Sequence, residues 1–340
     1  MSGGVDSAVA ALLAKRMGYE CEGVTMKLYG DCIGAGRAAE ALMIKHREVD
    51  FSREFQKRVI EPFICSYEAG ETPNPCIGCN TYIKFGMLYE YALSEGFDKL
   101  VTGHYARIEE GPDGALRLKR AADVKKDQSY FLYGLDYERL RHILFPLGGL
   151  TKQEVRGIAA EAGLPNAKKR ESQDICFVPD GGHARFIAGY RGFQSAGGDF
   201  VDTEGRVLGR HGGIERFTIG QRKKLGITLG RPVFVKEIRP NTGEVVLADE
   251  EEIFVSRIGL TDVNWLSGER DMKGSAAAAM RVSIAIRYNA KPVQATIKAG
   301  DGGRILAEFD EPARAPAKGQ AAVMYDGEYV IGGGKIEAVW

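Results

Sequence analysis

The 340-residue chain has no long apolar run, no excess of charge of either sign and only six cysteines. No segment approaches the roughly 18 consecutive apolar residues of a membrane helix, so the sequence predicts no membrane span. The first residues, Met1–Asp6, show no basic segment and no cleavage site, and we expect a cytoplasmic protein without a signal peptide. The 46 basic and 46 acidic side chains cancel. That balance neither requires nor excludes a nucleic-acid partner, because a basic face can coexist with a neutral total.

The few cysteines argue against a disulfide framework, which is typical of short secreted chains. Cys76 and Cys79 form a Cys-x-x-Cys motif, which in a cytosolic protein usually indicates metal, redox or sulfur chemistry. Glycine, by contrast, is abundant. Its 44 residues are nearly twice the usual share of about 7%, which favours many tight turns and phosphate-binding loops.

Helical and strand patterns alternate over residues 1–105, which predicts an α/β fold with a doubly wound parallel sheet. We assign residues 1–178 to this domain. Its expected helices are Asp6–Met17, Ala35–Lys45, Ser52–Tyr67, Asn80–Glu95 and, from a capping box at Thr151, a helix to Ala162. Its expected strands are Cys21–Leu28, Arg47–Phe51 and Phe97–Thr102, followed by a hairpin at Ala106–Arg120.

The pattern changes after about residue 178, where short β-like runs alternate with Gly, Asp and Asn turns. We therefore predict a small β-rich domain at 179–249 and a C-terminal β-barrel at 250–340. The expected strands are Phe200–Val201, Phe217–Ile219, Val233–Ile238, Val245–Leu247, Ala279–Arg287, Val293–Lys298, Arg304–Phe309, Ala321–Tyr325 and Tyr329–Ile336.

A glycine loop, Ser2–Ser7, leads directly into the first helix. The adjacent Gly3 and Gly4 let the backbone approach a phosphate, and a helix N-terminus supplies N–H groups and a positive dipole. Ser2 and Ser7 can donate hydrogen bonds, and Asp6 can hold Mg²⁺ near the phosphates. The string fits neither a Walker A loop nor G-x-G-x-x-G. The alternative is a plain glycine turn with Asp6 as a helix cap.

Two further thiol positions favour sulfur chemistry. Cys79 ends a proline-rich loop that runs into a helix, where the helix dipole is expected to lower its pKa. Cys176 is a single thiol in a polar loop, and we predict that it works with Cys79, one carrying sulfur and the other resolving it. The alternatives are buried structural thiols, a zinc site, which needs four ligands, or an iron–sulfur cluster on Cys76, Cys79 and Cys176 with one open iron.

Short basic segments recur along the chain. Lys125–Tyr130 is a polar cluster in which Asp127 is expected to cap an apolar helix, and Lys168–Arg170 and Arg222–Lys224 are basic triplets. Together they are compatible with contacts to a nucleic-acid backbone. A single basic segment of this kind is more often only a solvated part of the surface.

Over nearly its whole length the sequence closely resembles the tRNA-specific 2-thiouridylase family of PP-loop ATP pyrophosphatases. The motifs that carry this resemblance are Ser2–Ser7, Val24–Lys27, Asn74–Lys84, Thr102–Arg107, Lys126–Leu132, Glu171–Val178, Phe217–Arg222, Arg287–Ala290, Lys318–Gln320 and Gly332–Gly334. Several long motifs in one order are specific, whereas Ser-Gly-Gly-x-Asp-Ser alone would indicate only the superfamily.

The resemblance implies roles for individual residues. ATP and Mg²⁺ would bind at Ser2, Gly3, Gly4, Val5, Asp6 and Ser7, with Met26 and Gly103 at the adenosine. The target base would lie at Asn74, Pro75 and Cys76, with Cys79 as nucleophile and Cys176 as persulfide carrier. The contacts with tRNA would come from His104, Lys126, Asp127, Gln128, Arg287, Tyr288 and Gln320.

The activity that follows is ATP-dependent 2-thiolation of the wobble uridine in the anticodon stem-loop of tRNA. ATP adenylates the C2 oxygen, and sulfur then passes from a Cys176 persulfide with Cys79 resolving it, which releases AMP and pyrophosphate. The expected sulfur donor is a cysteine desulfurase or a sulfur-relay protein. The alternatives are a PP-loop synthetase that adenylates a small metabolite, and a metal or sulfur carrier built on Cys-x-x-Cys.

The chain departs from the family pattern in two features. An Asp assigned to acid–base work commonly stands where this chain has Cys76. Proton transfer is then handled differently, or the thiols bind a [4Fe–4S] cluster. In the family the glycine loop follows a buried strand, whereas here only Met1 precedes it. We therefore expect a sheet without its central strand and a fold of marginal stability.

Overall fold

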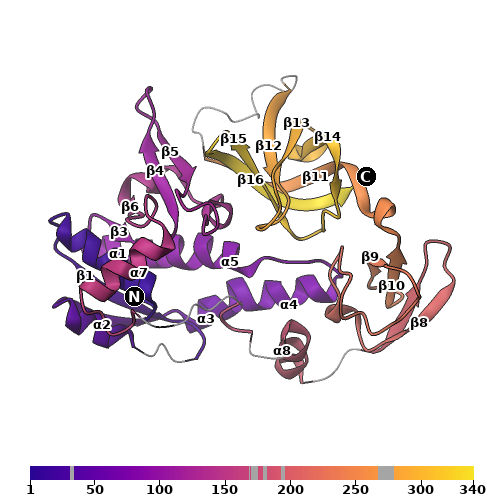
Figure 1. Ribbon diagram of the computed structural model, residues 1–340, viewed down its shortest axis with the longest axis horizontal. Helices are drawn as coiled ribbons and strands as arrows, with labels where there is room; N and C mark the ends of the chain where they lie inside the picture. Colours follow the sequence, from indigo (N-terminus) through magenta and orange to yellow (C-terminus); the bar gives the residue numbers. More distant parts are fainter. Residues whose placement is uncertain (31–33, 168, 170–174, 179–181, 193–195, 267–278) are drawn as a thin grey trace.

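The computed structural model describes residues 1–30, 34–167, 169, 175–178, 182–192, 196–266 and 279–340. Three regions follow one another along the chain (Figure 1). The hairpin of β4 (Ala106–Glu110) and β5 (Leu116–Arg120) projects upward from the α/β region beside a closed barrel, and a small sheet lies below the barrel in this view. Lys168, Arg170 and Glu171–Asp174, which the sequence placed in a basic run and a polar loop, are outside the described residues.

The α/β region contains parallel strands with helices beside them, as predicted. Its elements as far as the hairpin are α1 (Val5–Arg16), β1 (Glu22–Lys27), α2 (Ala35–Ala41), β2 (Lys45–Asp50), α3 (Ser52–Phe55), η1 (Gln56–Ile60), α4 (Glu61–Glu68), α5 (Pro75–Gly78), η2 (Cys79–Met87), α6 (Leu88–Ser94) and β3 (Leu100–Val101). The hairpin and the elements after it are β4 (Ala106–Glu110), β5 (Leu116–Arg120), η3 (Ser129–Leu132), η4 (Tyr137–His142), β6 (Ile143–Leu144) and α7 (Lys152–Glu161).

The parallel strands form two separate pairs among the described residues, β1 with β2 and β3 with β6, rather than one continuous sheet. The amino group of Met1 donates to the carbonyl of Val24, and Thr25 Oγ1 donates to the carbonyl of Met1 at 2.7 Å. Met1 therefore lies beside β1. Helix α1 packs against α7, α2 and β3, and its small buried face consists largely of alanine.

Two long helical segments cross the α/β region and change type along their length. Residues 52–68 and 75–94 are each continuous, but both pass through a π-helix, η1 and η2. The second segment begins at Pro75, whose fixed φ suits the first helical position. The sequence prediction placed that start at Asn80, so the helix begins five residues earlier than expected.

The C-terminal region is a closed antiparallel barrel, as predicted. Its strands are β11 (Phe254–Trp265), β12 (Met280–Ala285), β13 (Val293–Ala299), β14 (Ile305–Arg314), β15 (Ala321–Asp326) and β16 (Tyr329–Val339). The order β11-β14-β13-β12-β15-β16 closes through pairing of β16 with β11. Alternate side chains of β13 and β14 are buried, which gives the barrel its core of Ile, Val and Ala.

The central region combines one helix with a four-stranded sheet. Its elements are α8 (Gly182–Arg191), β7 (Gly198–Val201), β8 (Val207–His211), η5 (Ile214–Arg216), β9 (Phe234–Arg239) and β10 (Glu244–Ala248), with η6 (Glu250–Ile253) leading to the barrel and η8 (Asp301–Gly303) inside it. The strand order is β8-β7-β10-β9. Helix α8 was not expected in this β-rich region, and the expected strand at 217–219 is not a strand.

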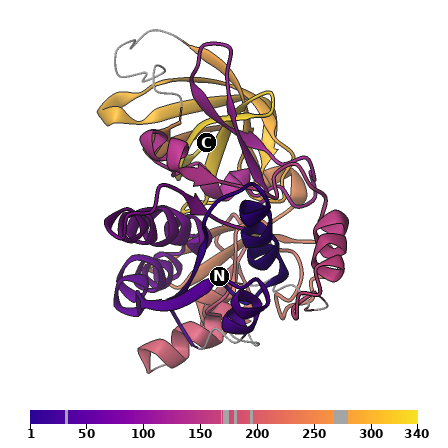
Figure 2. The same ribbon diagram turned by 90° about the vertical axis from the view of Figure 1, so that its left-hand side faces the viewer.

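The hairpin joins the α/β region to the barrel. Strand β5 pairs with β16 at Lys119 and Tyr329, and Arg120 N donates to the carbonyl of Glu328 at 2.9 Å. The barrel sheet therefore continues into the hairpin, as Figure 2 shows from the side of the α/β region. None of the described helices is long and apolar enough to cross a membrane.

Candidate functional site

The glycine loop leads into the N-terminus of α1, as the sequence predicted. Gly4 is the N-cap residue, and within the described chain no side chain caps the first turn of α1. Gly3 has φ +71°, a left-handed conformation that favours glycine. The Ser2 and Ser7 hydroxyl oxygens lie 3.2 Å apart, and Ser7 Oγ donates to the carbonyl of Gly4 at 3.1 Å. The first turn of α1 therefore keeps N–H groups available for an anion.

Contacts from distant parts of the chain fix the loop. Asn166 Nδ2 donates to the carbonyl of Gly4 at 2.8 Å, and Lys169 Nζ donates to that of Gly3 at 3.2 Å. Gly103, which lies two residues after β3, packs against the backbone of Asp6 and Ser7. A Cβ at this position would come within 2.7 Å of the Asp6 carbonyl carbon and 2.8 Å of Ser7 N. The two backbones therefore approach each other at a distance that only glycine permits.

Asp6 is held by protein groups. Its carboxylate oxygens accept from Lys152 Nζ at 2.7 and 2.8 Å, and Oδ1 also accepts from the Tyr105 hydroxyl at 2.9 Å. An Mg²⁺ ion bound to Asp6 would have to share this carboxylate with an ammonium group. The loop thus fits the phosphates of ATP, with Lys152 and Lys169 nearby to balance their charge. Asp6 as an Mg²⁺ ligand fits less well.

The cysteine helix carries the predicted target-base residues at its start. Asn74 is the N-cap of α5, Pro75 is buried and Cys76 is exposed. Cys79 is buried at the junction between α5 and η2, so it does not lie at a free helix N-terminus. Burial raises the pKa of its thiol, with an opposing effect from Lys84. The expectation that the helix dipole lowers this pKa is therefore wrong, because the helix begins at Pro75.

Cys176 lies near both thiols of the cysteine helix. Its side chain is exposed at the surface, but partial desolvation, together with the neighbouring Cys79 and Cys76, raises its pKa to about 11, while Lys84 opposes them. The next residue, Phe177, packs between Phe55 and Phe63 with ring centroids 5.6 and 5.2 Å away. All five described cysteines are free thiols.

The iron–sulfur alternative lacks support from the geometry. Among the residues that the structure describes, which include Cys76, Cys79 and Cys176, no group of three His, Cys, Asp or Glu side chains is placed to hold a metal ion. The three thiols are close enough to interact electrostatically, but they do not form a ligand set.

The predicted tRNA residues come together where the barrel meets the α/β region. Tyr288 packs on Phe131 with ring centroids 4.3 Å apart, and Gln320 Oε1 accepts from the Tyr130 hydroxyl at 3.4 Å. Arg287 Nη2 donates to the carbonyl of Ile219 at 2.9 Å and also bonds to that of Ala315. Tyr288 and Gln320 in the C-terminal region thus lie beside the segment that follows Lys126.

Two of these predicted residues, Asp127 and Gln128, form hydrogen bonds with other groups of the protein. Asp127 is buried, and its carboxylate accepts from Ala121 N, Ser129 N and Ser129 Oγ at 3.0, 3.1 and 2.9 Å. The N-cap of the short η3 helix is Gln128, not Asp127. Gln128 Oε1 accepts from Tyr105 N at 3.0 Å. Direct contact of Asp127 with tRNA stays a prediction, and its visible function is to shape this segment.

His104 is also buried, at 7% exposure. Its Nδ1 lies 2.8 Å from Thr102 Oγ1, and its Nε2 lies 3.3 Å from Lys84 Nζ. The sequence assigned His104 to tRNA contact, which stays a prediction. The structure adds Lys84, Tyr105, Lys152 and Asn166 to the site. Their spacing gave no signal, because they meet only through the tertiary fold.

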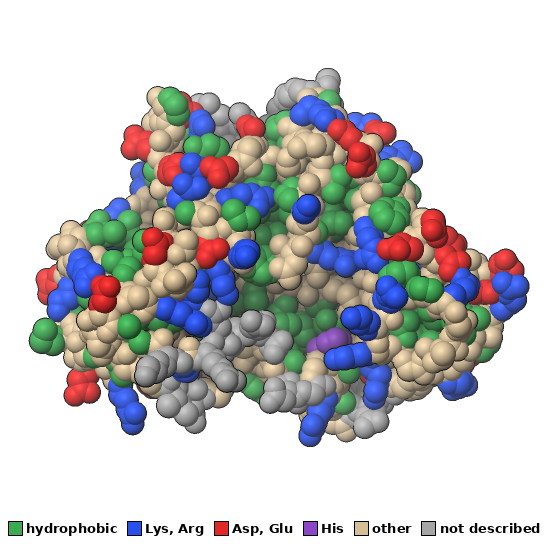
Figure 3. All heavy atoms as spheres, in the orientation of Figure 1, with side chains coloured by type: hydrophobic (Ala, Val, Ile, Leu, Met, Phe, Trp, Pro, Cys, Tyr) green, Lys and Arg blue, Asp and Glu red, His purple; other side chains and the backbone are tan. Residues whose placement is uncertain are grey.

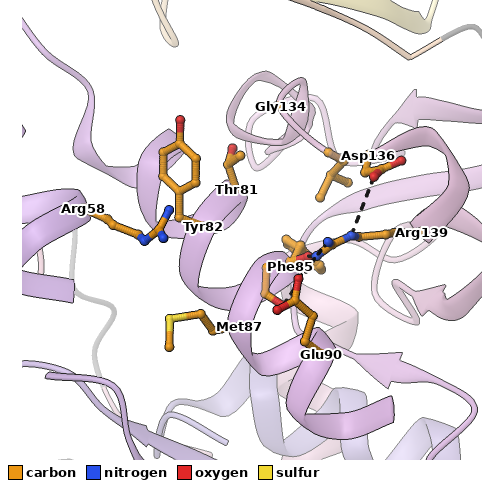
Figure 4. Close-up of a pocket in the computed structure, with 11 residues that line it drawn as sticks. Arg58, Thr81, Tyr82, Phe85, Met87, Glu90, Gly134, Asp136 and Arg139 are labelled. Atoms are coloured by element: carbon orange, nitrogen blue, oxygen red, sulfur yellow. Dashed lines mark hydrogen bonds and ion pairs between the residues drawn. The ribbon is translucent and has the colours of Figure 1, made fainter. Parts of the chain in front are cut away.

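A separate pocket of about 250 Å³ lies on η2 (Figure 4). Its lining is Arg58, Thr81, Tyr82, Phe85, Gly86, Met87, Glu90, Gly134, Leu135, Asp136 and Arg139. Arg139 pairs with Glu90 at 2.9 Å and donates to the carbonyl of Phe85 at 2.6 Å. None of the predicted site residues lines it, and its contacts anchor the helix that carries Cys79.

One face of the molecule is hollowed. Figure 3 shows a hollow at the centre of this face, with hydrophobic side chains in its floor and Lys and Arg side chains around it. The α/β region and the barrel border it (Figures 1 and 3). A basic rim around an apolar floor suits a nucleic acid whose base leaves the stack.

Comparison with known proteins accounts for all three regions. Residues 1–180 match the family described as the tRNA methyl transferase HUP domain, and residues 184–249 match the tRNA methyl transferase PRC-barrel domain. Residues 255–336 match the aminomethyltransferase beta-barrel domain. These matches confirm the predicted fold class.

Curated relatives align over the full length. The tRNA-specific 2-thiouridylase MnmA of Lachnoclostridium phytofermentans is 46% identical over 353 residues, covering 99% of this chain and 98% of the relative. The protein of the same name from Clostridium perfringens is 44% identical over 355 residues, covering 100% and 97%. The one from Clostridioides difficile is 44% identical over 353 residues, covering 99% and 96%.

Proposed function

Since this chain belongs to the tRNA-specific 2-thiouridylase family, we propose that it thiolates C2 of the wobble uridine in tRNA by adenylation followed by persulfide transfer. The chain is accordingly a tRNA sulfurtransferase. A metabolite synthetase would use the glycine loop but would leave Cys79, Cys176 and the barrel without a function. The proposal gives a function to Cys79, to Cys176 and to the barrel.

One chain of contacts carries the proposal. Gly103 lies against Asp6 and Ser7 of the glycine loop, and the next residue, His104, holds Lys84. Lys84 acts electrostatically on Cys79 and Cys176. These links support one site that contains both the phosphate loop and the sulfur-bearing residues, as coupled adenylation and sulfur transfer require.

In the first step the glycine loop positions ATP. The N–H groups at the start of α1, together with Lys152 and Lys169, face the phosphates. The C2 oxygen of uridine attacks the α-phosphorus, pyrophosphate leaves, and the N3 proton of the base is released. Mg²⁺ bound together with ATP would supply positive charge for the departing pyrophosphate. The oxygen becomes part of AMP, which is a better leaving group.

In the second step the terminal sulfur of a Cys176 persulfide attacks C2 and displaces AMP. The base is then joined to Cys176 through a disulfide bond. The Cys79 thiolate attacks the Cys176 sulfur, which breaks that bond and leaves the electron pair on the base sulfur. Protonation at N3 gives 2-thiouridine. The Cys79–Cys176 disulfide must be reduced by an external thiol before the next turnover.

We favour this persulfide route over the cluster route because it needs only two thiols. Cys76, Cys79 and Cys176 would otherwise have to become a ligand set that the described geometry does not provide. The persulfide is expected to come from a cysteine desulfurase or a sulfur-relay protein in the cytoplasm. The base must leave the anticodon stack to reach the thiols, at a cost of a few kcal/mol.

The test is a thiolation assay with iron-free protein purified anaerobically. Protein, ATP, Mg²⁺, a persulfide donor and unmodified tRNA are incubated, and 2-thiouridine is measured by nucleoside mass spectrometry. Wild type should form it, Cys79→Ser and Cys176→Ser should not, and Cys65→Ser, at an exposed thiol outside the site, serves as the matched control. Activity that requires reconstitution with iron and sulfide would refute the persulfide route. Small-amine adenylation without RNA would favour a synthetase.

A further inference from the structure

Lys84 occupies a particular place on the cysteine helix. It follows Cys79 by five residues, and both belong to the π-helix η2. In a π-helix the N–H of a residue bonds to the carbonyl five residues before it, so residues five apart lie on the same side of the helix. The bond from Leu88 N to the carbonyl of Ile83 shows this register at the end of η2. A regular α-helix would turn Lys84 away from the side that carries Cys79.

The ammonium group of Lys84 is held by a buried imidazole. Lys84 Nζ lies 3.3 Å from His104 Nε2, and His104 Nδ1 lies 2.8 Å from Thr102 Oγ1. Burial and the Lys84 charge lower the pKa of His104 well below its usual range, so the ring is neutral. A neutral ring that accepts from Lys84 at Nε2 carries its proton on Nδ1 and donates it to Thr102.

The rings around His104 fix its orientation. Phe85 and Phe145 pack against it with centroids 5.6 and 5.8 Å away. Since His104 cannot rotate freely, the position of its Nε2 atom restricts where the Lys84 ammonium can lie. From that position Lys84 acts to lower the pKa of Cys76, Cys79 and Cys176, and so opposes the burial that raises the pKa of Cys79.

We propose that Lys84, positioned by His104, stabilises the thiolates that transfer sulfur in this site. The use of those thiolates in tRNA thiolation rests on the proposed function. The electrostatic effect on the thiols does not, and it can be measured without tRNA or ATP. When Cys79 attacks the Cys176 sulfur, Lys84 is the cation that acts on both the attacking sulfur and the sulfur under attack. His104 is a positioning residue, since it acts through Lys84.

The test measures the reactivity of each cysteine against pH. The folded protein is alkylated with iodoacetamide between pH 6 and 10, and each modified peptide is quantified by mass spectrometry. In Lys84→Met the apparent pKa of Cys79 should rise by about one unit, which means about tenfold slower alkylation at pH 8. Lys84→Arg keeps the charge and should stay within about twofold of wild type, by the same conversion.

The controls use the same chemistry elsewhere in the chain. Lys57→Met makes the identical change at an exposed lysine on the other long π-containing segment, in η1, and should leave Cys79 unchanged. Cys21 and Cys65 are internal controls in each sample, and the pH dependence of their alkylation should match that of wild type in every variant. His104→Gln should shift Cys79 in the same direction as Lys84→Met, but less.

Three results would overturn the proposal. They are an unchanged Cys79 profile in Lys84→Met, an equal shift in Cys21 and Cys65, or a Lys84→Arg profile that matches Lys84→Met. Should Lys84→Met fail to fold, His104→Gln and Lys84→Arg decide the question by the same criteria. If Lys84→Met shifts the Cys79 profile as expected but the wild-type protein never thiolates tRNA, the proposed function is refuted and this inference stands.

Discussion

The close approach of Gly103 to the glycine loop gives a sharp test of the ATP site. In Gly103→Ala the new methyl group would lie 2.7 Å from the Asp6 carbonyl carbon, whereas ordinary contact begins at 3.4 Å. The atoms that it meets are backbone atoms of Asp6 and Ser7, so no flexible side chain can move aside. The first turn of α1 must shift instead, and the N–H groups that face the phosphates shift with it.

The size of the effect follows from the cost of overpacking. Inserting a methyl group into a filled space typically costs about 1–3 kcal/mol. Because ATP binding must restore the original position of the loop against this cost, and every 1.4 kcal/mol is tenfold in affinity, ATP binding should weaken by up to about 140-fold. Binding of tRNA should change little, because its predicted contacts lie at the junction of hairpin and barrel.

The assay is isothermal titration of each variant with a non-hydrolysable ATP analogue, together with its thermal unfolding. Gly149→Ala is the matched control, since a Cβ there meets nothing within 4 Å and the position is exposed. That variant should bind the analogue as wild type does. If Gly103→Ala also binds normally and unfolds at the wild-type temperature, Gly103 does not position the loop and the reasoning fails.

Three further predictions follow from the thiols and the loop. Cys76→Asp should keep thiolation in iron-free protein, because Cys76 is not a sulfur carrier in the persulfide route; loss of activity would count against that route. Loading of Cys176 by a persulfide donor should accelerate between pH 7 and 9, since its pKa of about 11 makes the thiolate fraction grow about tenfold per pH unit; a flat profile would contradict the raised pKa. Asp6→Asn and Lys152→Met should reduce AMP formation to a similar extent without changing the Mg²⁺ requirement, because the two groups form one ion pair. A higher Mg²⁺ requirement in Asp6→Asn alone would make Asp6 a metal ligand.

Local patterns predicted much of the fold. The capping box at Thr151 forms as expected and opens α7, and the alternation at Val293–Lys298 becomes β13. Helix Ala35–Lys45 was predicted too long. It ends at Ala41, because Lys45–Asp50 pairs with β1 as a strand. That pairing is long-range and outweighs the helical pattern.

Other elements were missed because the tertiary fold decides them. Strand β11 spans Phe254–Trp265 and is stabilised by two neighbours, β14 and β16, rather than by its own pattern. The π-helix η2 has no sequence signature, yet it sets the register between Cys79 and Lys84.

The site was only partly readable from the sequence for a similar reason. The glycine loop and the cysteines are contiguous motifs, so sequence reasoning found them. Lys152 and Asn166 reach the loop from more than 140 residues away, and no local pattern predicts such a meeting. The pKa of Cys79 was predicted in the wrong direction because its burial is a property of the folded core.

The continuity of the barrel sheet into the β4–β5 hairpin has a mechanical consequence. Swinging the barrel away from the α/β region would break the pairing of Lys119 with Tyr329. It would also break the bond from Thr72 N to the carbonyl of Lys318 and the ion pair of Lys335 with Glu71. These two bodies are therefore expected to move as one rigid unit on the timescale of turnover. The central region shares no strand with either body and is joined to them by side-chain contacts such as Arg191 with Glu68 and Arg287 with Ile219, so a motion that opens the hollow for a bulky substrate is expected to move this region.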